Sequence, residues 1–124
     1  MIKRIVIAGC RNYNNYEEAK KYIDICIKEI KNKYTLIFVS GSCSGADMLG
    51  ERYAKEHNYQ IERYPAQWKK YGKKAGPLRN KQMIDIGDFI ICFWDGESRG
   101  TKTTIDFAKS LQKPLRIKMI TIPS

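Results

Sequence analysis

Residues 4–39 read RIVIAGCRNYNNYEEAKKYIDICIKEIKNKYTLIFV, and this segment alone predicts the fold class. Two short apolar runs rich in β-branched residues, 5–8 and 36–39, flank a segment of helical period that extends from about residue 14 to residue 31. Strand, helix and strand in this order form a βαβ unit with parallel strands and a right-handed crossover. The opening of the chain therefore predicts an α/β protein.

The rest of the chain repeats this alternation. We expect further helices and strands, the helices at about residues 44–56, 77–86 and 101–111 and the strands at about residues 61–64, 89–94 and 115–119. Because the apolar runs are continuous, helices must cover both faces of the sheet. The prediction is a single Rossmann-like domain over residues 1–124, with a five-stranded parallel sheet and helices on both faces. Residues 65–76 form the longest connection, and we expect them to fold over the ligand site as a lid.

Residues typical of helix starts support these boundaries. Asn14 with Glu17, and Ser44 with Asp47, stand three residues apart where a helix is expected to begin, as in a capping box. Pro77 suits the first position of a helix, where its missing N–H costs nothing.

The composition favours one globular core and excludes several classes of protein. The chain has 124 residues, of which 43% are hydrophobic, and this suffices for a single core. No apolar run reaches 18 residues and no secretion signal precedes the first strand, so we expect a cytoplasmic protein with no membrane partner. The cysteines lack CxxC spacing and His57 is the only histidine, so the sequence predicts no metal site, no cofactor and free thiols at Cys10, Cys26, Cys43 and Cys92.

The net charge leaves nucleic acid as a possible partner. Lysine and arginine number 23 against 13 aspartates and glutamates, a formal charge of +10 that attracts polyanions. Lys69, Lys70, Lys73 and Lys74 alternate with Tyr71 in one short segment. Such a run forms either a site for single-stranded nucleic acid or an ordinary solvated surface.

In an open parallel sheet, ligands bind beyond the carboxyl ends of the strands, so the residues that follow each strand are the candidates for a site. Gly9, Cys10 and Arg11 follow the first strand. The glycine permits close approach of a ligand to the backbone, and the arginine suits bidentate contact with a phosphate. An ordinary glycine turn with an exposed arginine accounts for the same residues.

The loop after the second strand is rich in small residues and leads into a helix. It reads SGSCSGAD from Ser40 to Asp47 and includes Gly41, Ser42 and Gly45. Free N–H groups at a helix N-terminus favour an anion, although the spacing matches neither the GxGxxG nor the GxxxxGK[ST] fingerprint. Asp47 fits a contact with a ribose hydroxyl, and it fits equally a helix cap.

The loop after the fourth strand, residues 95–101, is the best phosphate cradle in the chain. It contains Asp95, Ser98 and Arg99, and then Gly100 and Thr101 open the expected helix. Glycine removes side-chain obstruction, threonine adds a hydroxyl, and the first-turn amides supply donors.

Arg79 and Asn80 stand in the first turn of another expected helix. A cation there opposes the helix dipole, and a bound anion would remove the conflict. An ion pair with Asp47, Asp85 or Asp95 would remove it too. No histidine lies near a nucleophile and no GxSxG elbow occurs, so no catalytic residue is predicted, and Cys10 and Cys43 are interpreted as residues that line the site.

Five motifs in a fixed order resemble the YspA-type branch of the SLOG superfamily, which is named for the Smf/DprA and Lonely Guy proteins. They are Gly9-x-Arg11, Ser40-Gly41-x-x-x-Gly45-Ala46-Asp47, Pro65-Ala66-x-Trp68, Ala75-Gly76-Pro77-x-Arg79-Asn80-x-x-Met83 and Ser98-Arg99-Gly100-Thr101. The resemblance covers roughly residues 5–114 and implies a Rossmann-like fold that binds nucleotide-derived ligands. The predicted ligand-binding residues are Gly9, Cys10, Arg11, Ser40, Gly41, Ser42, Gly45, Asp47, Trp68, Arg79, Asn80, Asp95, Ser98, Arg99, Gly100 and Thr101.

The resemblance also bears on activity. Lonely Guy enzymes carry a PGGxGTxxE motif whose glutamate serves glycosidic hydrolysis, and alignment of its GT with Gly100-Thr101 puts Thr104 in the place of that glutamate. The leading hypothesis is therefore a binding protein for ADP-ribose, cyclic ADP-ribose or an NAD-related molecule, acting as a sensor, a carrier or a phage-borne sponge in defence signalling. The alternatives are a nucleotide N-glycosidase and a module for single-stranded nucleic acid.

Apolar residues beyond the needs of one sheet suggest a homo-oligomer. They are Tyr22, Ile23 and Ile27 on the first expected helix and the tail at residues 119–122.

Overall fold

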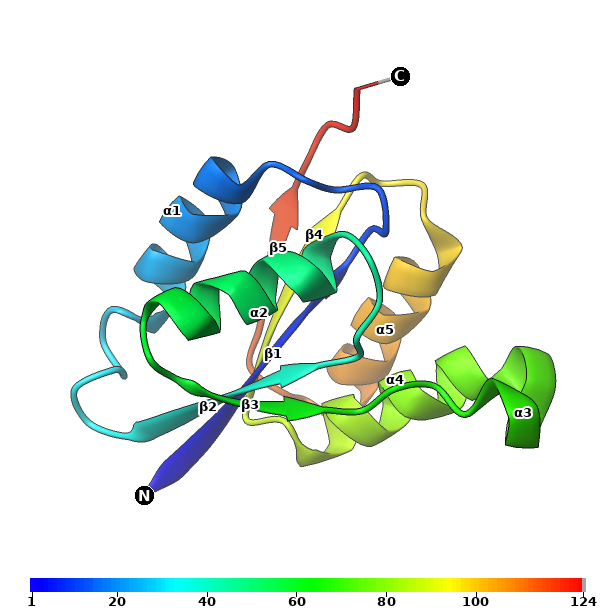
Figure 1. Cartoon of the computed structure of the whole chain (residues 1–124), viewed down its shortest axis with the longest axis horizontal. Coiled ribbons are helices and arrows are strands. Elements are labelled where there is room, and N and C mark those ends of the chain that lie inside the picture. The colour runs from blue at the N-terminus through cyan, green and yellow to red at the C-terminus, as the bar shows by residue number, and fades with distance from the viewer. Residues whose placement is uncertain (124) are drawn as a thin grey trace.

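The computed structural model describes residues 1–123 and alternates strands with helices along the chain (Figure 1). The strands are β1 (Ile2–Gly9), β2 (Thr35–Ser40), β3 (Gln60–Arg63), β4 (Phe89–Trp94) and β5 (Leu115–Met119). The helices are α1 (Tyr16–Ile27), α2 (Ala46–Glu56), α3 (Trp68–Tyr71), the 3₁₀ turn η1 (Gly72–Lys74), α4 (Ala75–Ile86) and α5 (Arg99–Ser110).

All five strands are parallel and lie in the order β3-β2-β1-β4-β5. Val6 in the central strand β1 pairs with Val39 of β2 on one side and with Ile90 of β4 on the other. The direction of strand addition therefore reverses at β1, and this reversal makes the carboxyl ends of β1 and β4 the expected place for a ligand. The predicted Rossmann-like α/β class is confirmed.

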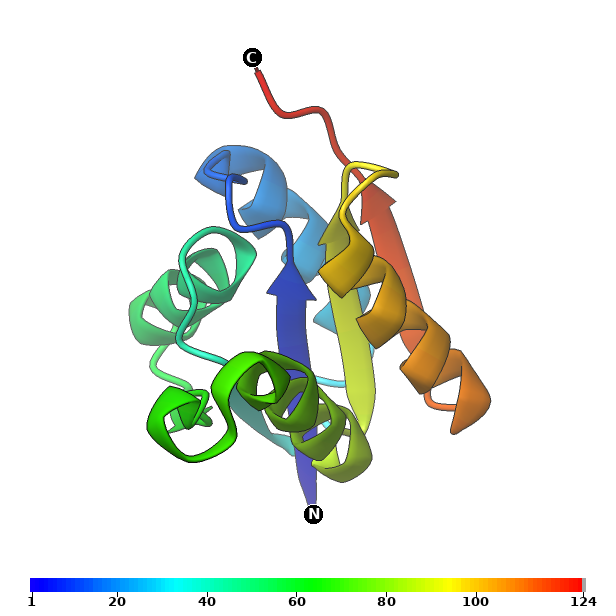
Figure 2. The same cartoon turned by 90° about the vertical axis from the view of Figure 1, so that its right-hand side faces the viewer.

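Helices cover both faces of the sheet, each over its own hydrophobic core (Figure 2). Successive side chains of a strand point to opposite faces, and β1 shows the consequence directly. Ile5 and Ile7 pack with residues of α1 and α2, whereas Val6 and Ala8 pack with residues of α4 and α5. All four side chains are buried, so β1 contributes equally to the two cores.

Three of the residues expected to form an oligomer face belong instead to the first core, and they are Ile23, Ile27 and, in the tail, Ile120. Ile23 and Ile27 lie on the inner side of α1 and are fully buried. The helical period explains this burial, because positions 19, 23 and 27 recur at every fourth residue and share one face. The expected homo-oligomer stays a prediction, and these three side chains cannot contribute to its interface.

The segment expected as a long connection is mostly helical. Residues 68–74 form α3 and η1 and lead without a break into α4, which begins at Ala75. The sequence predicted Pro77 at the first position of this helix, but Pro77 is the third residue of α4. A proline is tolerated at this position because the first N–H groups of a helix have no intrahelical acceptor. No helix among residues 1–123 is long and apolar enough to cross a membrane.

The cap of α1 differs by one residue from the predicted one. Asn15, not Asn14, precedes the helix, and its Oδ1 accepts a hydrogen bond of 3.1 Å from the backbone N–H of Glu18. Asn15→Ala is expected to lower the free energy of unfolding by about 1 kcal/mol, because it leaves that N–H without its acceptor. Urea denaturation measures the change. Asn14→Ala is the matched control and should change it by much less, and equal losses would contradict the assignment of the cap.

Candidate functional site

A cleft of about 350 Å³ lies at the carboxyl ends of β1 and β4. Three loops line it, and these loops follow β1, β2 and β4. Arg79 and Asn80 also line it; the sequence predicted them in the first turn of their helix, but they lie in the second turn of α4 because the helix begins at Ala75. The tail after β5 adds Ile122. The cleft therefore occupies the position that the strand order predicts for a ligand site.

Two glycines allow the loop after β2 to reach this cleft. Gly45 has a φ of +80°, and a Cβ atom there would lie 2.3 Å from the carbonyl oxygen of Cys10. A Cβ atom on Gly41 would lie 2.8 Å from Arg79 Nη1 and 2.8 Å from Asp47 Oδ2. Side chains at these positions would displace the backbone or the two charged groups, so the glycines shape the site although neither lines the cleft.

Arg79 is a buried cation with only neutral partners. Its side chain is 6% exposed, and its guanidinium donates hydrogen bonds to the carbonyl oxygen of Gly41 and, over 2.8 Å, to Asn80 Oδ1. Nη2 lies 3.3 Å from Cys43 Sγ. Among residues 1–123, no carboxylate oxygen comes within 4.0 Å of the guanidinium. The ion pair that would have explained this arginine without a ligand is therefore not formed.

Asp47 is the buried acid of the cleft. Its Oδ2 accepts a hydrogen bond of 3.3 Å from the backbone N–H of Cys43, and the residue is 6% exposed. Burial raises its pKa to about 6, while the Cys43 amide and the charge of Arg79 oppose the increase. The predicted cap by Ser44 is wrong, because α2 begins after Gly45 without a side-chain cap. Asp47 instead holds the preceding loop.

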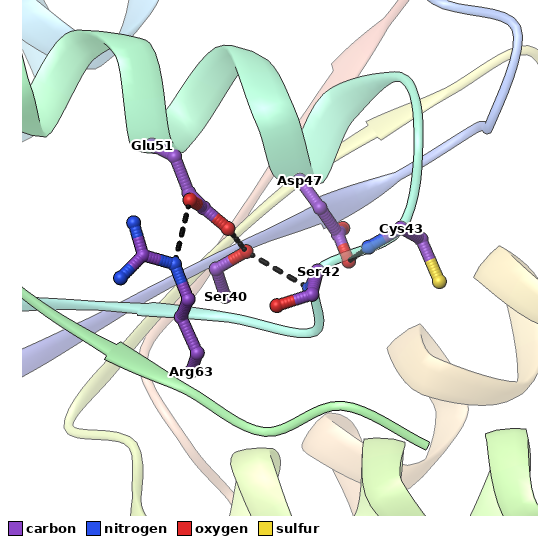
Figure 3. A network of polar contacts seen from close by, with 6 residues as sticks. All are labelled: Ser40, Ser42, Cys43, Asp47, Glu51 and Arg63. Atoms are coloured by element: carbon purple, nitrogen blue, oxygen red, sulfur yellow. Dashed lines mark hydrogen bonds and ion pairs between the residues drawn. The ribbon is translucent and has the colours of Figure 1, made fainter.

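A polar network behind the cleft holds the same loop (Figure 3). Ser40 Oγ donates to Glu51 over 2.7 Å and accepts from the backbone N–H of Ser42 over 3.1 Å. Arg63 forms an ion pair with the other oxygen of Glu51 at 2.9 Å. The sequence reasoning missed Glu51 and Arg63, although Glu51 stands one helical turn after Asp47 on the same face of α2.

The start of α5 has free backbone donors, and Gly100 among these residues lines the cleft. Ser98 caps the helix, and its Oγ accepts from the backbone N–H of Thr101 over 3.4 Å. Within residues 1–123, the amides of Arg99 and Gly100 have no acceptor, and no heavy atom lies within 4 Å of the position that a Cβ on Gly100 would take. Space and unpaired donors at a helix N-terminus suit a phosphate.

The remaining polar groups of this loop are engaged in local structure. Asp95 Oδ1 accepts from the amides of Glu97 and Ser98, each over 2.9 Å, and these bonds lower the pKa of Asp95. Cys10 Sγ lies 3.9 Å from Thr101 Oγ1, and burial raises the pKa of its thiol. A thiol with a raised pKa is a poor nucleophile, which agrees with the interpretation of Cys10 as a lining residue.

A family model described as YAcAr: YspA, cpYpsA-related SLOG family matches residues 3–71, from β1 to α3. The chain belongs to this YAcAr family. The YAcAr chain is also 32% identical over 108 residues to the Gene 61 protein of Mycobacterium phage D29, a match that covers 82% of this chain and 84% of the relative. The family predicted from the loop motifs is thereby confirmed.

Two solved structures share the fold of the YAcAr chain. DNA processing protein A from Helicobacter pylori, solved for its single-stranded DNA binding mode, gives a TM-score of 0.67 at 20% identity and covers 98% of this chain and 67% of that chain. A structural genomics target, TM1055, gives a TM-score of 0.64 at 16% identity and covers 93% of this chain and 72% of that chain. At these identities the likeness shows the fold alone.

The YAcAr cleft brings together most of the predicted ligand-binding residues. Those that line it are Gly9, Cys10, Arg11, Asp47, Arg79, Asn80, Asp95, Ser98, Gly100 and Thr101. Those that do not are Ser40, Gly41, Ser42, Gly45, Trp68 and Arg99. Trp68 is 51% exposed and its indole packs over Gly76, away from the cleft.

Four residues that the sequence analysis did not name as site residues also line the YAcAr cleft, and they are Ala8, Asn12, Thr104 and Ile122. Cys43 lines it too, as its interpretation as a lining residue predicts. Asn12 directly follows Arg11, and Thr104 lies one helical turn after Gly100, so spacing was a signal for both. The tail reaches the cleft because the N–H of Ile120 bonds to the carbonyl oxygen of Trp94, and nothing in the tail's own pattern indicates this contact.

Proposed function

We propose that the cleft binds a phosphate-bearing, nucleotide-derived small molecule of the ADP-ribose, cyclic ADP-ribose or NAD class. The observation that carries the proposal is the buried guanidinium of Arg79, which lines the cleft without a carboxylate partner among the described residues. Asp47 attracts this guanidinium but forms no ion pair with it within 4.0 Å, and a buried charge without a direct ionic partner is costly, so a bound anion offsets that cost.

In this proposal, each wall of the cleft contacts a different part of the ligand. The free amide of Gly100 receives the phosphate at the N-terminus of α5, and Arg79 neutralises its charge. Asp47 lies on the same cleft and orients a ribose hydroxyl. Arg11 is exposed at the rim and supplies a second cation.

Binding without turnover is the activity that these residues support best. Thr104 occupies the position of the glutamate in the Lonely Guy motif, and its hydroxyl donates to the carbonyl oxygen of Gly100 over 3.1 Å. That hydroxyl proton is committed to the helix backbone. Asp47, with a pKa of about 6, is the one group that suits general acid catalysis, so conversion of the ligand would favour the enzyme hypothesis instead.

The relative encoded by a phage supports the role of a sequestering protein over that of a host sensor. A protein that only binds a nucleotide signal lowers its free concentration in proportion to the number of binding sites. This role requires tight binding and an unchanged ligand, and both are measurable on the purified chain.

Gly100→Ala tests the placement of the phosphate. The new methyl group would enter open space at the start of α5, so we expect an unchanged or higher melting temperature together with at least tenfold weaker binding of ADP-ribose. Isothermal titration calorimetry measures the affinity, and native mass spectrometry shows whether ADP-ribose stays intact.

The matched control for Gly100→Ala is Thr103→Ala, which alters an exposed side chain of the same helix outside the cleft. This control should bind ADP-ribose as the wild type does. If Gly100→Ala bound ADP-ribose with wild-type affinity, the proposed position of the phosphate at the N-terminus of α5 would be wrong.

Single-stranded nucleic acid is the second candidate ligand. The Helicobacter pylori neighbour was solved for single-stranded DNA binding, and this chain carries a net charge of +10 with exposed lysines on α3 and η1. Binding through these lysines would weaken steeply with salt, in proportion to the phosphates contacted, whereas a small ligand in the cleft would respond far less. Fluorescence anisotropy of labelled oligothymidylate measures this salt dependence and separates the two candidates. The salt concentration should run from roughly 50 to 200 mM, the range over which phosphate contacts lose most of their affinity.

A further inference from the structure

A second cleft of about 340 Å³ lies between α4 and the segment that leads from β3 into α3. Pro65, Gln67 and Tyr71 line one side, and Leu78 and Gln82 line the other. Arg79 belongs to both this cleft and the one at the strand ends. The two clefts are therefore neighbours that share one cationic side chain.

The sequence of α4 places Arg79 between the two clefts. Positions 75, 78, 79 and 82 recur at helical spacing and turn one face of α4 toward the second cleft, while position 80 faces the first. Gly76 holds the opposite wall in place, because a Cβ there would lie 3.3 Å from the indole of Trp68. The indole thus packs on α4 and keeps α3 beside it.

The chemistry of the second cleft suits a planar heteroaromatic group. The ring of Tyr71 and the side chain of Leu78 are each 43% exposed, so an apolar surface is available for stacking. The amides of Gln67 and Gln82 offer both donors and acceptors for ring nitrogens and exocyclic groups. Lys70 Nζ lies 5.1 Å from the centre of the Tyr71 ring and adds positive charge nearby.

We propose that the two clefts bind the two halves of one dinucleotide-type ligand, with its bridging phosphates at Arg79 and its base against Tyr71. This inference rests on the proposed function and extends it, because a ribose phosphate alone would occupy only the first cleft. Each cleft is at the lower end of the size of small-ligand sites, and a molecule with two nucleoside-like halves requires both. The protein then discriminates between ligands by the half that occupies the second cleft.

The test compares ADP-ribose with ribose 5-phosphate by calorimetry, on the wild type and on Tyr71→Ala. Tyr71 is exposed, so the variant should keep the wild-type melting temperature. We expect Tyr71→Ala to bind ADP-ribose about tenfold more weakly, as loss of base stacking does, and to bind ribose 5-phosphate with unchanged affinity. Tyr71→Phe keeps the ring and should retain wild-type binding of both probes.

Leu111→Ala serves as the matched control, since it removes another exposed apolar side chain that lines neither cleft. Equal affinities of the wild type for the two probes, or ADP-ribose affinity unaffected by Tyr71→Ala, would overturn the second subsite and leave the phosphate site standing. Failure of both probes to bind the wild type would overturn the proposed function and this extension with it.

Discussion

Arg79→Met is expected to weaken the binding of ADP-ribose about 100-fold. A charge-assisted hydrogen bond to a phosphate contributes roughly 2–3 kcal/mol, and the same substitution removes the buried cation that lines the cleft. Methionine keeps most of the apolar stem, so the wall between α4 and the loop after β2 remains filled. Calorimetry at constant salt measures the loss of affinity.

Two further variants separate charge from geometry at this position. Arg79→Lys keeps the positive charge and loses the planar fork, so it should restore part of the affinity and not all of it. Arg116→Met removes an exposed arginine from β5 and should leave binding unchanged, which controls for the fall in net charge. Wild-type binding by Arg79→Met would contradict the role given to the buried guanidinium.

Asp47→Asn is expected to stabilise the protein at pH 8 by about 2–3 kcal/mol. The pKa of Asp47 is about 6 in the folded protein against an ordinary value of 3.8, and each unit of difference corresponds to roughly 1.4 kcal/mol. The folded state therefore holds the proton more tightly than the unfolded state does. The resulting stability is fully present below pH 4 and is lost as the pH rises to 6.

Asparagine stays neutral at every pH, so the Asp47→Asn variant should not lose stability between pH 4 and pH 6 as the wild type does. The difference in unfolding free energy between the variant and the wild type should grow from pH 4 to pH 6 and then remain constant to pH 8. Urea denaturation at the three pH values measures it, with the exposed Asp106→Asn as the control. A variant less stable than the wild type at pH 8 would mean that Arg79 and the Cys43 amide outweigh the burial of the carboxylate.

The spacing of apolar residues predicted most of the fold, because this spacing alone distinguishes strands from helices. The bounds of β4 and β5 agree with the sequence prediction, since β4 is a short apolar run and the apolar residues of β5 alternate with Arg116 and Lys118. Residues 68–74 have no such pattern, because lysines and exposed aromatics fill them. Their helical turns depend on the packing of Trp68 over Gly76, a tertiary contact that local sequence does not encode.

The sequence predicted correctly which loops form the site, but it predicted less well which of their side chains line the cleft. Residues that follow parallel strands must gather at one edge, so Gly9, Asp95 and Thr101 were found by position. The direction of a side chain within a loop depends on backbone angles that are not visible beforehand. Ser42 has a φ of +61°, and its side chain does not line the cleft. Ser40 likewise turns to Glu51, its partner across the loop.

The central place of β1 has a consequence for how the chain acquires its fold. β1 leaves the ribosome well before β4, which begins at Phe89 and pairs with the second edge of β1. Until α4, β4 and α5 are synthesised, Val6, Ala8 and Val39 have no helix to cover them. A nascent chain that ends near residue 71 thus displays both an open strand edge and an apolar sheet face, and it is the intermediate most exposed to aggregation.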